Sequence, residues 1–264
     1  MDKTNEEIID LGVWETPKSW DDLSLKTYQE IVKFYDGTDK NIDVREIVHI
    51  LCGKTIDEVN ALPLEFFEMI IQDMAFVLTT PEVKEPSNKI TINGETYVVN
   101  IMEKLKTGEW VALDTIIKND KFNYAAMLAV LCRKEGEIYD SNFEANIFEE
   151  RQKMWEKQPV MNILPIITFF FTLMARVRET FPVVYGGGGS RKPHSAEFRN
   201  FSETWGFQKI VFEMADEKIE KVAQVNQQYL SDFFLFLTYL IQKGEMEDQE
   251  DKYQQQLRDA KRRR

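Results

Sequence analysis

Residues 158–175 read QPVMNILPIITFFFTLMA, and no charged side chain occurs among them. Lys157 precedes this stretch and Arg176 follows it. A helix that spans a membrane needs about 20 predominantly apolar residues, whereas this run is shorter and contains Asn162 and Pro165. We therefore predict that the stretch is a buried core helix, not a membrane span, and that the rest of the fold packs around it.

The whole chain has the composition of a folded globular protein. Its 264 residues are 43% hydrophobic and 30% charged, which suffices for one large core or two modest ones. The first residues are acidic where a secretory signal would be basic and then apolar, so we expect a protein that is not exported. The formal net charge of −12 argues against sequence-independent binding of DNA or RNA, because phosphate neutralisation needs a basic face.

One basic segment stands at the C-terminal end of this acidic chain. It comprises Arg258, Lys261, Arg262, Arg263 and Arg264. Cations near a helix C-terminus offset the negative end of the helix dipole, so a solvated helix end is one interpretation. The other interpretation is a charged tail that docks on an acidic partner or on nucleic acid.

Residue types that carry catalysis or metal binding are sparse. The two histidines, His49 and His194, are too few for a His-based triad or a His-x-x-x-His metal site. Cys52 and Cys132 stand far apart in apolar sequence, which predicts buried free thiols. The 45 acidic residues predict solvated faces, since no pair lies in an apolar setting that would raise a pKa. We therefore expect no enzymatic activity, no cofactor and no metal site.

Helical periodicity dominates residues 1–185, which we predict to form one domain. Ser24 is a suitable N-cap for the first helix. Thr55 and Glu58 match a capping box, and Gly53 is a natural helix terminator. The expected helices cover residues 25–35, 44–51, 63–78, 107–117, 122–131, 143–156 and 158–175, with a short one after residue 55.

A β-hairpin interrupts this helical pattern near residues 89–99. Two alternating apolar runs flank Asn93-Gly94, the pair best suited to a type I′ turn, in which both residues need positive φ. A lone hairpin is only marginally stable in water. We therefore expect it to pack on helices or to receive a partner strand.

A glycine run at 186–189 opens a predicted flexible linker that extends to residue 197. Beyond it, residues 198–264 predict a C-terminal helical segment with a charged tail. Apolar spacing indicates one short helix up to Met214 and then one long helix over residues 218–264, with a candidate break at Gly244. The first half of the long helix is apolar on one face. Its second half is charged and glutamine-rich, so it projects into solvent or lies on a partner.

These patterns together predict a mainly α fold. It would be a helical bundle with one small β-hairpin insertion, followed by a C-terminal long-helix segment. The segment carries the candidate partner-binding residues. They are Tyr229, Phe233, Phe234, Leu237 and Leu240 on its apolar face, and Arg262, Arg263 and Arg264 at its basic end.

The order of packing signals near the start of the chain resembles a known group of proteins. Trp20 with Leu23-Ser24-Leu25 matches a W-x-x-L-[ST]-L opening, and the capping box at 55–58 and then Leu62-Pro63 follow it. This order is similar to the N-terminal region of tail-assembly proteins of tailed bacteriophages. The similarity continues loosely through the hairpin and the 128–131 helix, and it covers about the first two thirds of the chain.

The C-terminal segment carries a second resemblance. Trp205-Gly206-Phe207 and the helical residues 229–239 are similar to the extensions that many phage tail assembly chaperones acquire by ribosomal frameshifting. Four glycine codons at the junction would give a G-rich message, which is compatible with such slippage of the ribosome. An engineered glycine-serine joint would have the same protein sequence.

The resemblance implies a non-enzymatic morphogenesis protein that binds phage tail structural subunits in the host cytoplasm before or during their polymerisation. The alternative is a structural virion protein, such as a portal-associated ring or a head–tail connector subunit, which would stay in the particle. Homo-oligomers fit both. No membrane partner is expected, and nucleic acid is expected only through the basic end.

Overall fold

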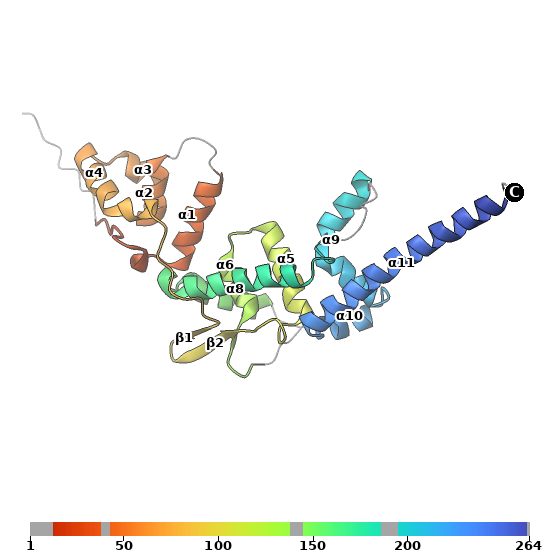
Figure 1. Ribbon diagram of the computed structural model, residues 1–264. Coiled ribbons are helices and arrows are strands. Elements are labelled where there is room, and N and C mark those ends of the chain that lie inside the picture. Colours follow the sequence, from red (N-terminus) through yellow and green to blue (C-terminus); the bar gives the residue numbers. More distant parts are fainter. Residues whose placement is uncertain (1–12, 38–42, 138–144, 186–194, 263–264) are drawn as a thin grey trace, which may run out of the picture.

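The computed structural model describes residues 13–37, 43–137, 145–185 and 195–262, and it confirms a mainly α fold with a small β insertion (Figure 1). The helices are α1 (Leu25–Gly37), α2 (Val44–Cys52), α3 (Ile56–Asn60), α4 (Leu64–Asp73), α5 (Thr107–Asn119), α6 (Tyr124–Leu131), α7 (Ala145–Glu156), α8 (Val160–Thr180), α9 (Ala196–Met214), α10 (Ile219–Asn226) and α11 (Leu230–Arg262). Short 3₁₀ helices are η1 (Trp20–Asp22) and η2 (Met74–Leu78).

Local signals in the sequence fold as predicted. The Glu58 amide donates to Thr55 Oγ1 at 3.2 Å while Glu58 accepts from the Thr55 amide, which completes the capping box. Gly53 ends α2 in the left-handed region at φ 62°. Asn93 and Gly94 both have positive φ, as the hairpin turn requires. Each of these features involves residues within a few positions of one another.

The hairpin gains a third strand that the sequence pattern did not reveal. β1 (Lys89–Ile92) pairs with β2 (Glu95–Val99), and β2 pairs antiparallel with β3 (Cys132–Lys134). The Tyr97 ring also packs edge-on against Trp155 of α7, with 5.4 Å between centroids. The sheet is therefore supported on both sides of its central strand and by a helix.

The apolar stretch forms α8, which is longer than predicted. It begins at Val160 and continues to Thr180, so among the described helices α8 is the one with the length and composition to span a membrane. The expectation that the run is too short was therefore wrong. One face of α8 nevertheless lies in the protein core, where Ile163, Phe170 and Val177 are at most 2% exposed.

The start of α1 is fastened to the corner between α7 and α8 by two backbone hydrogen bonds. The Leu25 amide donates to the Gln158 carbonyl at 2.8 Å. The Val160 amide donates to the Leu23 carbonyl, also at 2.8 Å. These bonds use backbone groups at helix starts that have no partner within the helix. We call this arrangement a backbone clasp.

A second backbone clasp has the same form. It joins the start of α5 to the corner between α10 and α11. The Thr107 amide donates to the Gln228 carbonyl at 2.9 Å, and the Leu230 amide donates to the Leu105 carbonyl at 2.8 Å. The predicted single helix over 218–264 is therefore broken at residues 227–229, and Gly244 lies within continuous helix.

Side chains repeat across the two corners with a shift of 70 residues. Gln158 Nε2 donates to the Met154 carbonyl, and Gln228 Nε2 donates to the Gln224 carbonyl. The hydroxyls of Thr168 and Thr238 each donate to the carbonyl four residues earlier, at 2.8 Å in both helices. The equivalence therefore extends from the corners into α8 and α11.

Helix contacts also repeat, which defines two equivalent units. In the first unit α1 contacts α6, α7 and α8, and α6 contacts α7. In the second unit α5 contacts α9, α10 and α11, and α9 contacts α10. α9 bends at Gly206, where φ is 49°, so its last eight residues correspond to the eight residues of α6. The chain therefore contains one four-helix arrangement twice.

Residues on both sides of the predicted linker share one core. Phe234 of α11 is 0% exposed. The rings around it have centroids 5.2–5.9 Å from its own, and they belong to Trp110, Phe181, Tyr185, Phe207 and Phe233. Residues 1–185 and 198–264 can be told apart by their sequence patterns, but in the structure they are not two separately packed bodies. Residues 186–194 lie outside the described residues.

Truncation of this shared aromatic centre provides a test. Phe234→Ala should lower the free energy of unfolding by about 3–5 kcal/mol, because a fully buried ring is replaced by a cavity. The control Phe236→Ala, at a half-exposed position two residues away, should change it by about 0.5 kcal/mol or less. Urea unfolding followed by circular dichroism measures both. Equal effects would contradict the shared core.

Candidate protein-binding surface

The inner faces of α8 and α11 are buried alike. At the equivalent positions the first unit has Val160, Ile163, Leu164 and Ile167, and the second has Leu230, Phe233, Phe234 and Leu237. All eight side chains are at most 8% exposed. These positions face the other helices of their own units, so they form the cores of the two units.

The neighbouring face of the two helices differs in how far it is buried. In α8, Ile166 and Phe170 are 1% and 2% exposed. Their equivalents in α11, Phe236 and Leu240, are 51% and 39% exposed. The second unit therefore presents to solvent an apolar face that the first unit buries.

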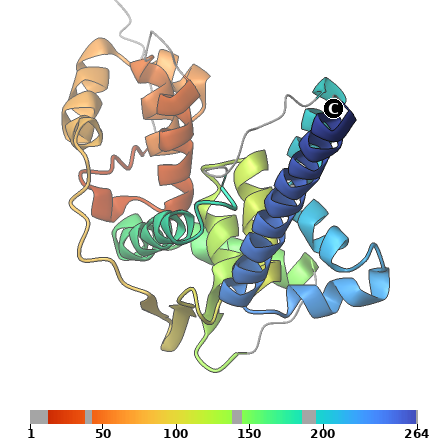
Figure 2. The ribbon, with the colours of Figure 1, turned by 45° about the vertical axis from the view of Figure 1, so that its right-hand side comes forward.

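Elements outside the repeat pack on α8. η1 and β1 both contact it, and the Ser87 amide donates to the Pro165 carbonyl at 3.2 Å. In Figure 1 the hairpin and the N-terminal helices flank α8, whereas α11 extends away from the rest of the molecule. The turned view of Figure 2 shows the N-terminal helices and α11 on opposite sides of the picture. Within the described part of the chain, these covering elements belong to the first unit alone.

The uncovered face consists of Leu235, Phe236, Tyr239 and Leu240, and we call it the outer α11 face. Leu235 is 66% exposed and Tyr239 is 55% exposed. The rings of Phe236 and Tyr239 stack with centroids 6.2 Å apart. Contiguous exposed apolar side chains of this kind mark contact sites in soluble proteins. Sequence reasoning included only Leu240 of this set, and the 70-residue shift between α8 and α11 is the signal that identifies the others.

A second apolar feature lies between α9 and α10 of the same unit. It is a hollow of about 460 Å³ with Trp205, Phe212 and Val222 among its lining residues. Lys209 and Glu213 add charge at its lining. An apolar hollow with a few charged groups suits an inserted side chain of a partner.

The predicted partner-binding residues divide into three groups. Phe233, Phe234 and Leu237 were predicted to bind a partner, but they are buried and not accessible to one, because the second unit uses them as its core. Tyr229 and Leu240 are exposed as predicted, and Lys106 Nζ lies 3.5 Å from the Tyr229 ring centroid. Arg262 ends α11 and is exposed, whereas Arg263 and Arg264 lie outside the described residues.

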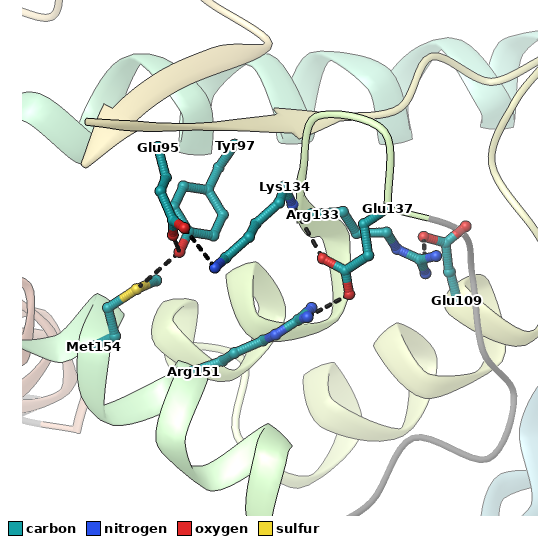
Figure 3. A network of polar contacts seen from close by, with 8 residues as sticks. All are labelled: Glu95, Tyr97, Glu109, Arg133, Lys134, Glu137, Arg151 and Met154. Atoms are coloured by element: carbon teal, nitrogen blue, oxygen red, sulfur yellow. Dashed lines mark hydrogen bonds and ion pairs between the residues drawn. The ribbon is translucent and has the colours of Figure 1, made fainter. Parts of the chain in front are cut away.

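A polar network beside the sheet is the main alternative as a site (Figure 3). Lys134 Nζ donates to Glu95 at 2.7 Å, and the Tyr97 hydroxyl donates to the same carboxylate at 3.2 Å. Arg151 of α7 forms an ion pair with Glu137. These contacts join β2, β3 and α7, and each charge in them is neutralised by a neighbour. The network therefore ties the sheet to the helices.

One ion pair in this region is buried. Arg133 Nη2 donates to Glu109 Oε1 at 2.5 Å, and the Lys106 amide donates to Glu109 Oε2 at 2.7 Å. Burial raises the pKa of Glu109 to about 7, against the opposing effect of the Arg133 charge. Both carboxyl oxygens already have hydrogen-bond partners, Arg133 and the Lys106 amide. Glu109 therefore helps to hold the start of α5 at Lys106, next to the Leu105 and Thr107 backbone groups of the second backbone clasp.

In the described part of the chain, no group of three His, Cys, Asp or Glu side chains is arranged to hold a metal ion. Cys132 is buried and Cys52 is half-buried, and both thiols are free. No protein-family profile, curated protein or solved structure matches the chain. The functional proposal therefore rests on this chain's own surfaces and sequence.

The raised pKa of Glu109 predicts a pH-dependent stability. Between its ordinary value of 4.5 and about 7, the unfolded chain has released this proton and the folded chain retains it. The stability contributed at Glu109 is therefore complete below pH 4.5 and is lost as pH rises through 7. Urea unfolding from pH 5 to 8 should show wild type losing stability relative to Glu109→Gln. A difference that stays constant over this range would contradict the assignment.

Proposed function

We propose that this protein is a non-enzymatic morphogenesis protein of a tailed bacteriophage that binds tail structural subunits during assembly, in the manner of a tail assembly chaperone. The sequence resemblance in the first two thirds of the chain and in residues 205–239 supports the phage context. The outer α11 face supports a protein-binding role. The work would take place in the host cytoplasm.

The single observation that carries the binding role is the unequal burial of two equivalent helices. α8 and α11 occupy the same place in their units, yet Phe170 is 2% exposed and its equivalent Leu240 is 39% exposed. In the first unit, η1 and β1 pack on α8. The first unit covers this face of α8 with other parts of the same chain. The equivalent face of α11 is therefore suited to being covered by another protein.

Binding there has a direct consequence for assembly. Phe236 and Tyr239 form a flat stacked pair, and flat aromatic surfaces provide much of the binding energy at protein interfaces. A tail subunit held on this face would have its own apolar assembly surface covered until polymerisation. The buried residues Phe233 and Phe234 act indirectly, because they hold α11 in place.

A structural virion protein is the second candidate. The outer α11 face and the hollow between α9 and α10 would then be covered permanently, in a ring or connector around the portal. The exposed apolar side chains of the second unit favour it as much as they favour a transient contact. The two candidates differ in whether the protein remains in mature particles.

Charge substitution on the outer face tests the binding role. Phe236→Asp and Leu240→Asp should each weaken binding of the chain to its tail subunit by about 30-fold or more, since a buried hot-spot contact contributes at least 2 kcal/mol. Calorimetric titration against separately expressed tail structural subunits of the source phage measures this. In cells, the same variants should produce heads without tails, as counted by electron microscopy.

The matched control is Leu64→Asp, which places the same charge at an exposed leucine of α4. It should leave binding and tail formation unchanged, and circular dichroism should be the same for all variants. Normal tails with Phe236→Asp would overturn the role of this face. Quantitative mass spectrometry of mature virions separates the two candidates, because a chaperone is absent there and a structural subunit is stoichiometric.

A further inference from the structure

The distal half of α11, residues 242–262, extends beyond the second unit. Figure 1 shows it leaving the body of the molecule as a continuous helix. All residues in this half except Glu245 are exposed. Because most of its surface is open, its conformation depends mainly on contacts within the helix or on another chain.

Apolar residues of this half follow a heptad pattern. Met246, Tyr253 and Leu257 are 62%, 55% and 40% exposed. Together with Lys243, Glu250 and Ala260 they are spaced alternately by three and four residues. This spacing places all six on one seam, as in a coiled coil, where such a seam faces a partner helix. The seam begins one turn beyond the outer α11 face and continues in the same direction.

Support for this half from within the chain is small. Lys243 pairs with Glu247 at 3.7 Å, and Gln254 Nε2 donates to Glu250 at 2.7 Å. Such exposed contacts contribute only about 0.2–0.5 kcal/mol each. A helix that is polar around most of its surface needs either many such pairs or a partner. The apolar seam indicates a partner.

The charges along this half indicate which partner helix fits the seam and whether it runs parallel or antiparallel. Residues 245–251 hold five acidic side chains and no basic one. Residues 252–258 hold Lys252 and Arg258 and no acidic one. In a parallel pair of copies, Lys243 and Glu250 would each face their own equivalents. In an antiparallel pair, the acidic run of each copy lies opposite the basic run of the other.

We propose that two copies of this chain associate through an antiparallel helix pair formed by residues 243–260, with Met246 of one copy opposite Leu257 of the other. In this register Glu250 faces Tyr253, whose hydroxyl is a suitable donor, and Lys243 faces the small Ala260. The interface is short and carries polar residues on its seam, so the dimer is weak and forms at micromolar concentrations.

This association is independent of the proposed function. It uses the distal seam and leaves Leu235, Phe236, Tyr239 and Leu240 open to a tail subunit. Two copies would thereby present two outer α11 faces at opposite ends of one helix pair. Loss of the pair and loss of tail-subunit binding are separate outcomes in separate assays.

Disulfide trapping tests the register directly. Met246→Cys and Leu257→Cys, mixed in equal amounts and mildly oxidised, should give a covalent dimer on non-reducing gels at least about tenfold more abundant than wild type gives. Each variant alone should not, because 11 residues at 1.5 Å per residue separate a position from its own equivalent by about 16 Å. Wild type controls for Cys52 and Cys132.

Sedimentation gives a second, non-covalent measurement on the full chain. At about 100 µM, wild type should sediment at up to twice its 31.1 kDa mass, and Met246→Glu/Leu257→Glu should sediment as a monomer. Gln255→Glu, on the opposite side of the helix, is the matched control and should behave as wild type. A monomeric wild type with no cross-linking would overturn the proposal. Efficient cross-linking of either variant alone would overturn the antiparallel direction.

Discussion

The fold depends on two backbone clasps, each of which joins the start of one helix to the corner before another. Helix starts leave amides without a partner inside the helix, and burial of unpaired backbone groups is costly. Each clasp satisfies two such amides with carbonyls far away in sequence, as Thr107 and Gln228 illustrate at a separation of 121 residues. Because the bonds run in both directions, they determine where α1 lies on α8 and where α5 lies on α11. The cores of both units form around these placements.

The repeat of this clasp makes the two halves of the molecule comparable position by position. Comparison of α8 with α11 separates residues that pack in the core of their own unit from exposed apolar residues that are available to bind a partner. Phe233, Phe234 and Leu237 belong to the first class, although their composition alone suggested a docking stripe. Phe236 and Leu240 belong to the second class, because η1 and β1, which pack on α8, have no counterpart on α11 among the described residues. The proposed contact with a tail subunit follows from that difference.

Several elements could be predicted from sequence because the interactions that form them are local. The capping box at Thr55, the helix end at Gly53 and the turn at Asn93-Gly94 each depend on side-chain chemistry or positive φ within four residues. Other elements could not. β3 forms because β2 offers a free edge, and the bend in α9 occurs where the Phe207 amide donates to Asp114 of α5. The break at residues 227–229 carries no glycine or proline, and the distant start of α5 supplies its hydrogen bonds.

The sequence by itself determined that the chain is mainly helical, where most helices begin, and that residues 158–175 include a helix with one face in the core. These properties follow from periodicity and capping, which act over one or two turns. Only the tertiary structure decided which apolar face of α11 is core and which is open, because burial depends on the elements that reach a face from elsewhere in the chain. Tyr239 and Phe234 are both aromatic residues of α11. Trp110 of α5 and Phe181 pack on Phe234, which is fully buried, whereas Tyr239 is 55% exposed.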